Sequence, residues 1–101
     1  MIARLWHGTT LSEVADDYLA YLLASGVADY RATPGNLGVQ VLQRREGRIA
    51  HFLIVSTWES LQAIEGFAGA DLTRARYYPE DDRYLLAREE RVQHYEIAAT
   101  T

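Results

Sequence analysis

The residues of this sequence that could do chemistry gather in the segment 74–84, RARYYPEDDRY, where three tyrosines, three acids and three arginines surround one proline. A proline followed by acids is typical of a helix start, because its fixed φ fits the first turn and carboxylates offset the helix dipole. Asp81 and Asp82 would point about 100° apart on that helix. They therefore cannot act together as an acid and base pair, and we interpret the acids mainly as a helix start.

The residues just before that proline favour a binding site. Arg76, Tyr77 and Tyr78 belong to a segment that must pack back toward the rest of the fold. A tyrosine hydroxyl left without a partner in a dry core costs about 1–3 kcal/mol. We therefore predict that these three residues contact a substrate and that at least one of His7, Tyr77 and Tyr78 lines its pocket.

A second group lies near the N-terminus, where Trp6 and His7 end an aromatic-rich segment. Neighbours on a strand face opposite sides, so only one of the two can face the helices, and the pattern leaves open which. A pocket histidine could take a phenolic proton, because its pKa lies near neutrality. The alternative is a histidine at a strand end that is exposed to solvent.

Trp58 ends the longest apolar segment, 50–58, at the point where the chain turns into a helix. One interpretation is a core tryptophan that seals the sheet against that helix. The other is a pocket wall that offers an indole N–H to a substrate oxygen. Phe52 and Ile54 share its side of the strand, and we predict that these two residues and Trp6 contact the same substrate.

Composition excludes several classes of function. The chain has no cysteine, hence no thiolate nucleophile or cysteine metal site, and His51 and His94 form no pair typical of metal ligation. We therefore expect no metal and no cofactor. The net charge of −4 argues against a nucleic-acid partner. No segment approaches the roughly 20 apolar residues of a membrane helix, and no signal peptide is evident, so we expect no membrane partner and a cytoplasmic location.

Periodicity and turn signals divide residues 1–101 into the elements of a single domain. Thr10 and Glu13 have capping-box spacing and predict a helix start, and Ser25–Gly26 predicts its end. The remaining expectations are a strand at 2–7, a connection at 27–38, a hairpin of strands 39–44 and 50–58, a helix from residue 59, further helix at 71–77, and a last strand at 92–97.

This order is the ferredoxin-like βαββαβ pattern of an α+β fold, with one antiparallel sheet and both helices on one face. Segment 51–57 is apolar on both sides, with Leu53 and Val55 pointing away from the helices. We also place Val39 and Val41 on that bare face. A second copy of the chain is the simplest partner to cover it, so we expect a homodimer joined through sheet faces.

The motif STWES at 56–60, the apolar residues of the helix after it, and ARYYPEDD at 75–82 together resemble the antibiotic biosynthesis monooxygenase family. The resemblance covers nearly the whole chain and implies a dimeric α/β barrel, two ferredoxin-like sheets packed face to face. Some members oxidise phenols or anthrones with dioxygen and without metal or flavin. Others degrade heme, using an asparagine on the first strand, a tryptophan after the third and a histidine beyond it.

Trp58 matches the tryptophan of the heme degraders, but the first strand has no asparagine and the region around Ala68 has no histidine. We therefore expect a cofactor-independent monooxygenase of an aromatic or polyketide-like small molecule, with His7 and Trp58 as catalytic residues. The alternatives are a binding or structural domain without turnover, and an isomerase or lyase on the same scaffold.

Overall fold

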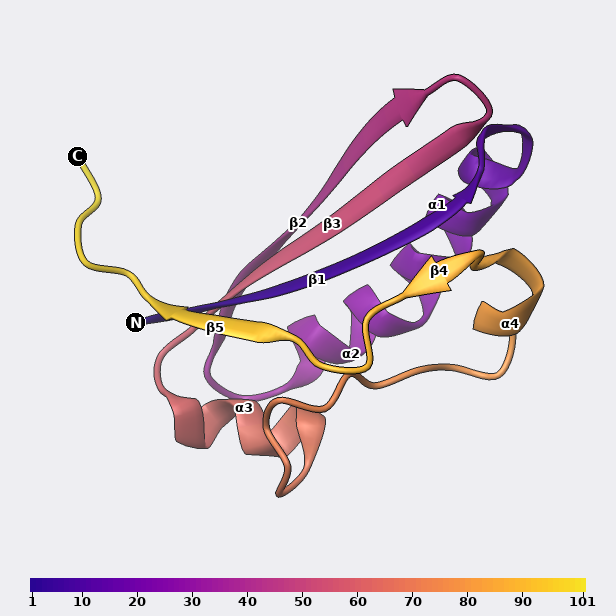
Figure 1. Ribbon diagram of the computed structural model, residues 1–101. Helices are drawn as coiled ribbons and strands as arrows, with labels where there is room; N and C mark the ends of the chain where they lie inside the picture. The colour runs from indigo at the N-terminus through magenta and orange to yellow at the C-terminus, as the bar shows by residue number, and fades with distance from the viewer.

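The computed structural model describes all 101 residues and shows one antiparallel sheet with helices against one face (Figure 1). The strands run in the order β2-β3-β1-β4, and β5 also pairs with β1. Their bounds are β1 Ile2–Leu11, β2 Asn36–Glu46, β3 Ile49–Trp58, β4 Ala87–Arg88 and β5 Gln93–Glu96. The predicted ferredoxin-like α+β fold is confirmed, with the last strand divided into β4 and β5.

The helices begin and end differently from the sequence expectation. They are α1 (Ala15–Ala24), α2 (Gly26–Ala32), α3 (Leu61–Ala68) and the single turn α4 (Asp81–Tyr84). Thr10 is not a helix cap, because β1 continues to Leu11 opposite Ile49 and the Thr10 hydroxyl bonds to a neighbouring carbonyl. Ser25 kinks the chain between α1 and α2, so part of the expected connection is helical. None of these helices has the length and apolar character needed to cross a membrane.

The hairpin of β2 and β3 is confirmed, with Gly47 supplying the positive φ (61°) of its turn. After β3, the Ser60 side chain caps α3 by accepting a hydrogen bond from the Ala63 amide at 3.1 Å.

The segment between α3 and α4, residues 69–80, is named the strap here. It turns at residues 72–73 and 79–80, and between these turns it runs along the helix side of the sheet without helix (Figure 1). The predicted helix at 71–77 is wrong, because the strap pairs with the chain near β5 instead. The Ala75 amide donates to the Glu90 carbonyl at 2.9 Å, and the Val92 amide donates to the Thr73 carbonyl at 2.7 Å. Tertiary pairing has overridden helix propensity.

The two faces of the sheet differ in what covers them. Alternate residues of β3, from Ala50 to Trp58, are buried against the helices, whereas Leu53 and Val55 are half-buried on the bare face. Val39 and Val41 pair with Ser56 and Ile54, so they lie on the helix side and our assignment of them to the bare face is wrong. Leu5, His7 and Leu42 occupy that face instead.

Candidate functional site

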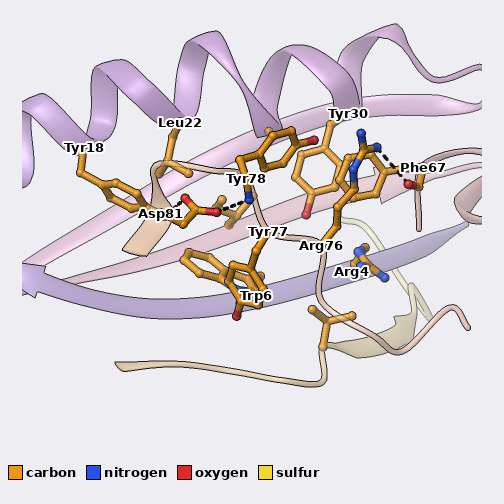
Figure 2. A pocket seen from close by; sticks show the side chains of 13 residues that line it. Arg4, Trp6, Tyr18, Leu22, Tyr30, Phe67, Arg76, Tyr77, Tyr78 and Asp81 are labelled. Carbon is orange, nitrogen blue, oxygen red and sulfur yellow. Dashed lines mark hydrogen bonds between the residues drawn. The ribbon is translucent and has the colours of Figure 1, made fainter. Parts of the chain in front are cut away.

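A small cavity lies between the helix side of the sheet, the helices and the strap (Figure 2). Its volume is about 30 Å³, above the roughly 10–15 Å³ that a cavity needs to hold one water. Every layer of the fold contributes to its lining: Arg4 and Trp6 from β1, Ile54 from β3, Tyr18 and Leu22 from α1, Gly26 and Tyr30 from α2, Phe67 from α3, Arg76, Tyr77 and Tyr78 from the strap, Asp81 from α4, and Val92. An aromatic ligand can enter only if part of this lining moves.

Trp6 and Tyr77 form one wall of the cavity. The Trp6 indole Nε1 donates a hydrogen bond to the Tyr77 hydroxyl at 2.9 Å, and the two rings meet edge to face at 6.2 Å. The Tyr77 hydroxyl in turn donates to the carbonyl oxygen of Glu89. These two hydrogen bonds give partners to the Trp6 indole N–H and the Tyr77 hydroxyl. They hold Tyr77 in the wall of the cavity, where we predicted it.

His7 lies on the opposite, bare face of the sheet. Because Trp6 faces the helices, strand alternation turns His7 away from the cavity, and our placement of His7 in the pocket is wrong. Its Nε2 lies 3.1 Å from Nδ1 of His51, the two rings stack at 5.4 Å, and its Nδ1 lies 3.5 Å from Glu89.

Trp58 and Phe52 lie behind the cavity rather than around it. Trp58 is wholly buried, and its Nε1 donates to the Ser56 hydroxyl at 2.9 Å. Its ring packs against Tyr30 at 6.0 Å and Phe67 at 6.2 Å, so these two rings separate it from the cavity. Of the two interpretations, the structure supports the core tryptophan. Phe52 is likewise wholly buried.

Asp81 is a buried carboxyl in the cavity wall, with only 4% of its surface exposed. Its Oδ2 accepts the Tyr78 backbone N–H at 2.6 Å, and its Oδ1 accepts the Tyr18 hydroxyl at 3.4 Å. Burial raises the pKa of Asp81 above the usual range of aspartate, although these hydrogen bonds oppose the rise. A buried carboxyl with a raised pKa is suited to general base chemistry.

Sequence reasoning took Asp81 only for part of a helix start. The available signal was its spacing, three residues after Tyr78, at which a carboxylate reaches back to a backbone N–H. Tyr18 and Tyr30 were also missed as lining residues; both are buried, and burial raises the pKa of each hydroxyl. They therefore act as neutral hydrogen-bonding groups.

Asp29, on α2, holds the strap against the helices. Its Oδ2 accepts the Tyr78 hydroxyl at 2.6 Å and lies 3.3 Å from the Arg76 guanidinium. Arg76 also donates to the Phe67 carbonyl at 3.1 Å, and its guanidinium lies 5.0 Å from the Phe67 ring. These contacts fix the strap beside the cavity, and Figure 2 shows the one between Arg76 and Phe67.

Arg4 is buried in the cavity wall beside the strap, with 1% of its surface exposed. One terminal nitrogen donates to the Leu72 carbonyl at 2.6 Å and to Nε2 of His94 at 2.9 Å; the other donates to the Arg74 carbonyl at 3.2 Å. Burial, and then the Arg4 charge, lower the pKa of His94, which accepts from Arg4 as a neutral ring. Strand alternation from Trp6 would have placed Arg4 on this face.

The structure contains no cluster of three histidine or acidic side chains that could hold a metal ion. The histidines are also dispersed relative to the cavity. His7 and His51 lie on the bare face, and His94 is bonded to Arg4.

The model of the antibiotic biosynthesis monooxygenase family matches residues 9–76. Among solved structures, a putative antibiotic biosynthesis monooxygenase from Bacillus cereus superposes with a TM-score of 0.70 and 11% identity, covering 99% of this chain and 95% of that one. The heme-degrader MhuD from Mycobacterium tuberculosis, with two hemes in its active site, superposes with a TM-score of 0.61 and 20% identity, covering 100% of this chain and 99% of that one.

A mutant of MhuD with two manganese protoporphyrin IX molecules per active site is similar at a TM-score of 0.63 and 19% identity, covering 100% of this chain and 98% of that one. At such identities these likenesses show the fold alone. None of the curated proteins matches the chain. The cavity described above does not fit a heme, because its volume is about 30 Å³ and no histidine lines it.

Proposed function

Because the chain belongs to the antibiotic biosynthesis monooxygenase family, we propose that it is a cofactor-independent monooxygenase of an aromatic or polyketide-like small molecule. The observation that carries the proposal is the buried carboxyl of Asp81 in a cavity walled by aromatic rings. Aromatic walls suit a flat apolar substrate, and a carboxyl with a raised pKa suits removal of a weakly acidic proton.

The proposed reaction converts an activated CH₂ group of an anthrone-like substrate into a carbonyl. Asp81 removes one proton, and the resulting carbanion gives an electron to dioxygen. The two radicals combine into a carbon–oxygen bond, and the peroxide then loses water. The balance is CH₂ + O₂ → C=O + H₂O, so carbon supplies all four electrons, one oxygen atom enters the product and the other leaves as water. Asp81 is the base, and the aromatic walls orient the ring.

The oxygen electrode tests this proposal. We would give anthrone to chelator-treated protein and follow oxygen uptake and quinone formation together. The expected result is one dioxygen consumed for each quinone formed, at a rate proportional to protein concentration. Anthrone that binds without oxygen uptake would contradict the proposal and favour a binding domain without turnover.

Replacing Asp29 with alanine is expected to loosen the strap and speed ligand entry. The variant removes the acceptor of the Tyr78 hydroxyl and the partner of Arg76. A hydrogen bond to a charged group contributes about 1.5–3 kcal/mol, and the exposure of Asp29 favours the lower end of that range. Losing it should raise the equilibrium constant for opening of the strap about tenfold. Hydrogen exchange of the strap amides measures this. The matched control is Asp16→Ala, which removes an exposed ion pair with Arg45, and equal exchange in both variants would contradict the expectation.

We also propose that two copies associate through their bare sheet faces, as the dimeric barrels of the family do. Leu5, Leu42, Leu53 and Val55 supply an apolar surface there that no helix of the same chain covers. An apolar surface that its own chain leaves uncovered is typical of an interface between subunits.

Leu53→Asp is expected to abolish this dimer, because it places a charge at the centre of the apolar face. Light scattering at micromolar concentration should give a dimeric mass for the wild-type protein and a monomeric or unfolded species for the variant. The matched control is Leu23→Asp, which changes an exposed leucine on α1. A monomeric wild-type protein would contradict the proposal.

A further inference from the structure

We infer that Arg4 binds an anion, and that the ligand of the cavity carries an oxyanion, a carboxylate or a phenolate, on its aromatic ring. The inference rests on the proposed use of the cavity as a binding site and adds the chemical class of what binds there. It starts from a charge that the fold buries and leaves without a counterion.

An arginine side chain keeps its positive charge inside proteins, and burying such a charge is costly unless an opposite charge accompanies it. None of the ion pairs of the chain includes Arg4. Its hydrogen-bond acceptors, the carbonyls of Leu72 and Arg74 and the ring of His94, are all neutral.

Tyr30 does not supply the missing charge. Burial raises the pKa of its hydroxyl, and the nearby Arg4 offsets only part of that rise, so Tyr30 stays neutral. Arg76, the other arginine of the cavity wall, is paired with Asp29. Arg4 is therefore the buried cation of this cavity that has no counterion, and the Phe67 ring, 5.7 Å from its guanidinium, is its aromatic neighbour.

The free donors of Arg4 suit a planar anion. Its Nε–H is buried and has no acceptor, and Nη2 forms the longest of its three hydrogen bonds, 3.2 Å to the Arg74 carbonyl. Nε and Nη2 share one edge of the guanidinium plane, the edge that binds two carboxylate oxygens through parallel hydrogen bonds. A single phenolate oxygen could accept from the same two groups.

Both carbonyls that Arg4 contacts belong to the strap, the segment that must move before a ligand enters. Displacing the strap would free further donors of Arg4, and an incoming anion would replace the two carbonyls as acceptor. His94 is on β5 rather than on the strap, so it can keep the guanidinium oriented during this exchange.

Three one-ring probes test the inference on the wild-type protein by calorimetry and thermal shift. Benzoate carries a carboxylate, benzamide is its neutral match, and 4-nitrophenol reports its own ionisation by visible absorption. We expect benzoate to bind at least about tenfold more tightly than benzamide, the discrimination typical of a charge-assisted hydrogen bond. If phenolate is the preferred source, bound 4-nitrophenol should be more ionised than free 4-nitrophenol at the same pH. Either preference supports the inference. The absence of both, whether the three probes bind equally or none binds, overturns it.

The variants Arg4→Met and Arg76→Met locate the preference. Arg4→Met should lose the discrimination between benzoate and benzamide, whereas Arg76→Met should keep it, because Arg76 already has a carboxylate partner. If circular dichroism shows that Arg4→Met does not fold, Arg4→Lys takes its place; it keeps the charge, loses the two-donor edge, and should bind benzoate more weakly than the wild-type protein. The reverse pattern, with the preference lost in Arg76→Met alone, overturns the inference.

Oxygen uptake separates this inference from the proposed function. A clear preference for benzoate in a protein that never consumes oxygen with anthrone would support the anion site and contradict the monooxygenase. Oxygen uptake with anthrone, together with no preference for any anionic probe, would support the monooxygenase and contradict the anion site.

Discussion

Asp81→Asn is expected to slow the oxygenation of anthrone by about 10²–10⁴-fold, the usual contribution of a general base. The carboxylate that would remove the proton is replaced by an amide that cannot accept it. The side chain keeps its shape, and an asparagine can retain both local contacts by accepting the Tyr78 N–H and donating to the Tyr18 hydroxyl. The loss should therefore appear in turnover and not in the circular dichroism spectrum or thermal stability.

The pH profile gives a second readout of the same substitution. Because burial raises the pKa of Asp81, its carboxyl ionises at a higher pH than an exposed aspartate. The base is active only when ionised, so the wild-type rate should rise with pH through that pKa, and this rise should be absent from Asp81→Asn. The matched control is Asp82→Asn. Asp82 lies on the same helical turn as Asp81, and the substitution removes its exposed ion pair with Arg88. Wild-type turnover in Asp81→Asn, or an equal loss in Asp82→Asn, would contradict the assignment of the base.

Trp58→Ala is expected to destabilise the fold by about 3–5 kcal/mol, the cost of emptying a buried aromatic site. Trp58 is wholly buried and packs against Tyr30 and Phe67, and its indole N–H bonds to Ser56. The truncation removes these contacts and leaves the Ser56 hydroxyl without its buried donor. Urea unfolding, followed by circular dichroism, measures the change.

Trp58→Phe is the control for the ring itself. It keeps most of the apolar contact and loses the hydrogen bond to Ser56, so we expect a loss of only about 1–2 kcal/mol. A Trp58→Ala variant as stable as the wild-type protein would show that the ring is not a core element. It would also favour the interpretation of Trp58 as a pocket wall. In the structure, the rings of Tyr30 and Phe67 form that wall instead.

Strand alternation and turn chemistry were enough to predict the fold and a small part of the site. The alternation of Phe52, Ile54 and Trp58 predicted which side of β3 faces the helices, and Gly47 predicted the turn of the hairpin. Strand alternation alone could not decide whether Trp6 or His7 faces the helices, because both are bulky and each could face inward. Only packing decides between them: the Trp6 indole donates a hydrogen bond to the hydroxyl of Tyr77, which belongs to the strap.

The rest of the site depends on contacts between residues far apart in the sequence. The residue types at 71–77 predicted a helix in the strap. Its backbone pairs instead with residues 90–92, and no local sequence pattern predicts this pairing. Asp81 differs from its acidic neighbours only through burial against Tyr18. Strand alternation puts Arg4 on the same face as Trp6, but arginine is rarely buried without a charged partner, so composition offered no reason to single out Arg4.

The most direct test of the central claim, oxygenation without a cofactor, is to supply ¹⁸O₂ to chelator-treated protein with anthrone and analyse the product by mass spectrometry. We expect one ¹⁸O atom in each quinone and the other in water, with this labelled product nearly absent from the Asp81→Asn reaction. Quinone that carries no ¹⁸O, or that forms equally well without the protein or with Asp81→Asn, would contradict it.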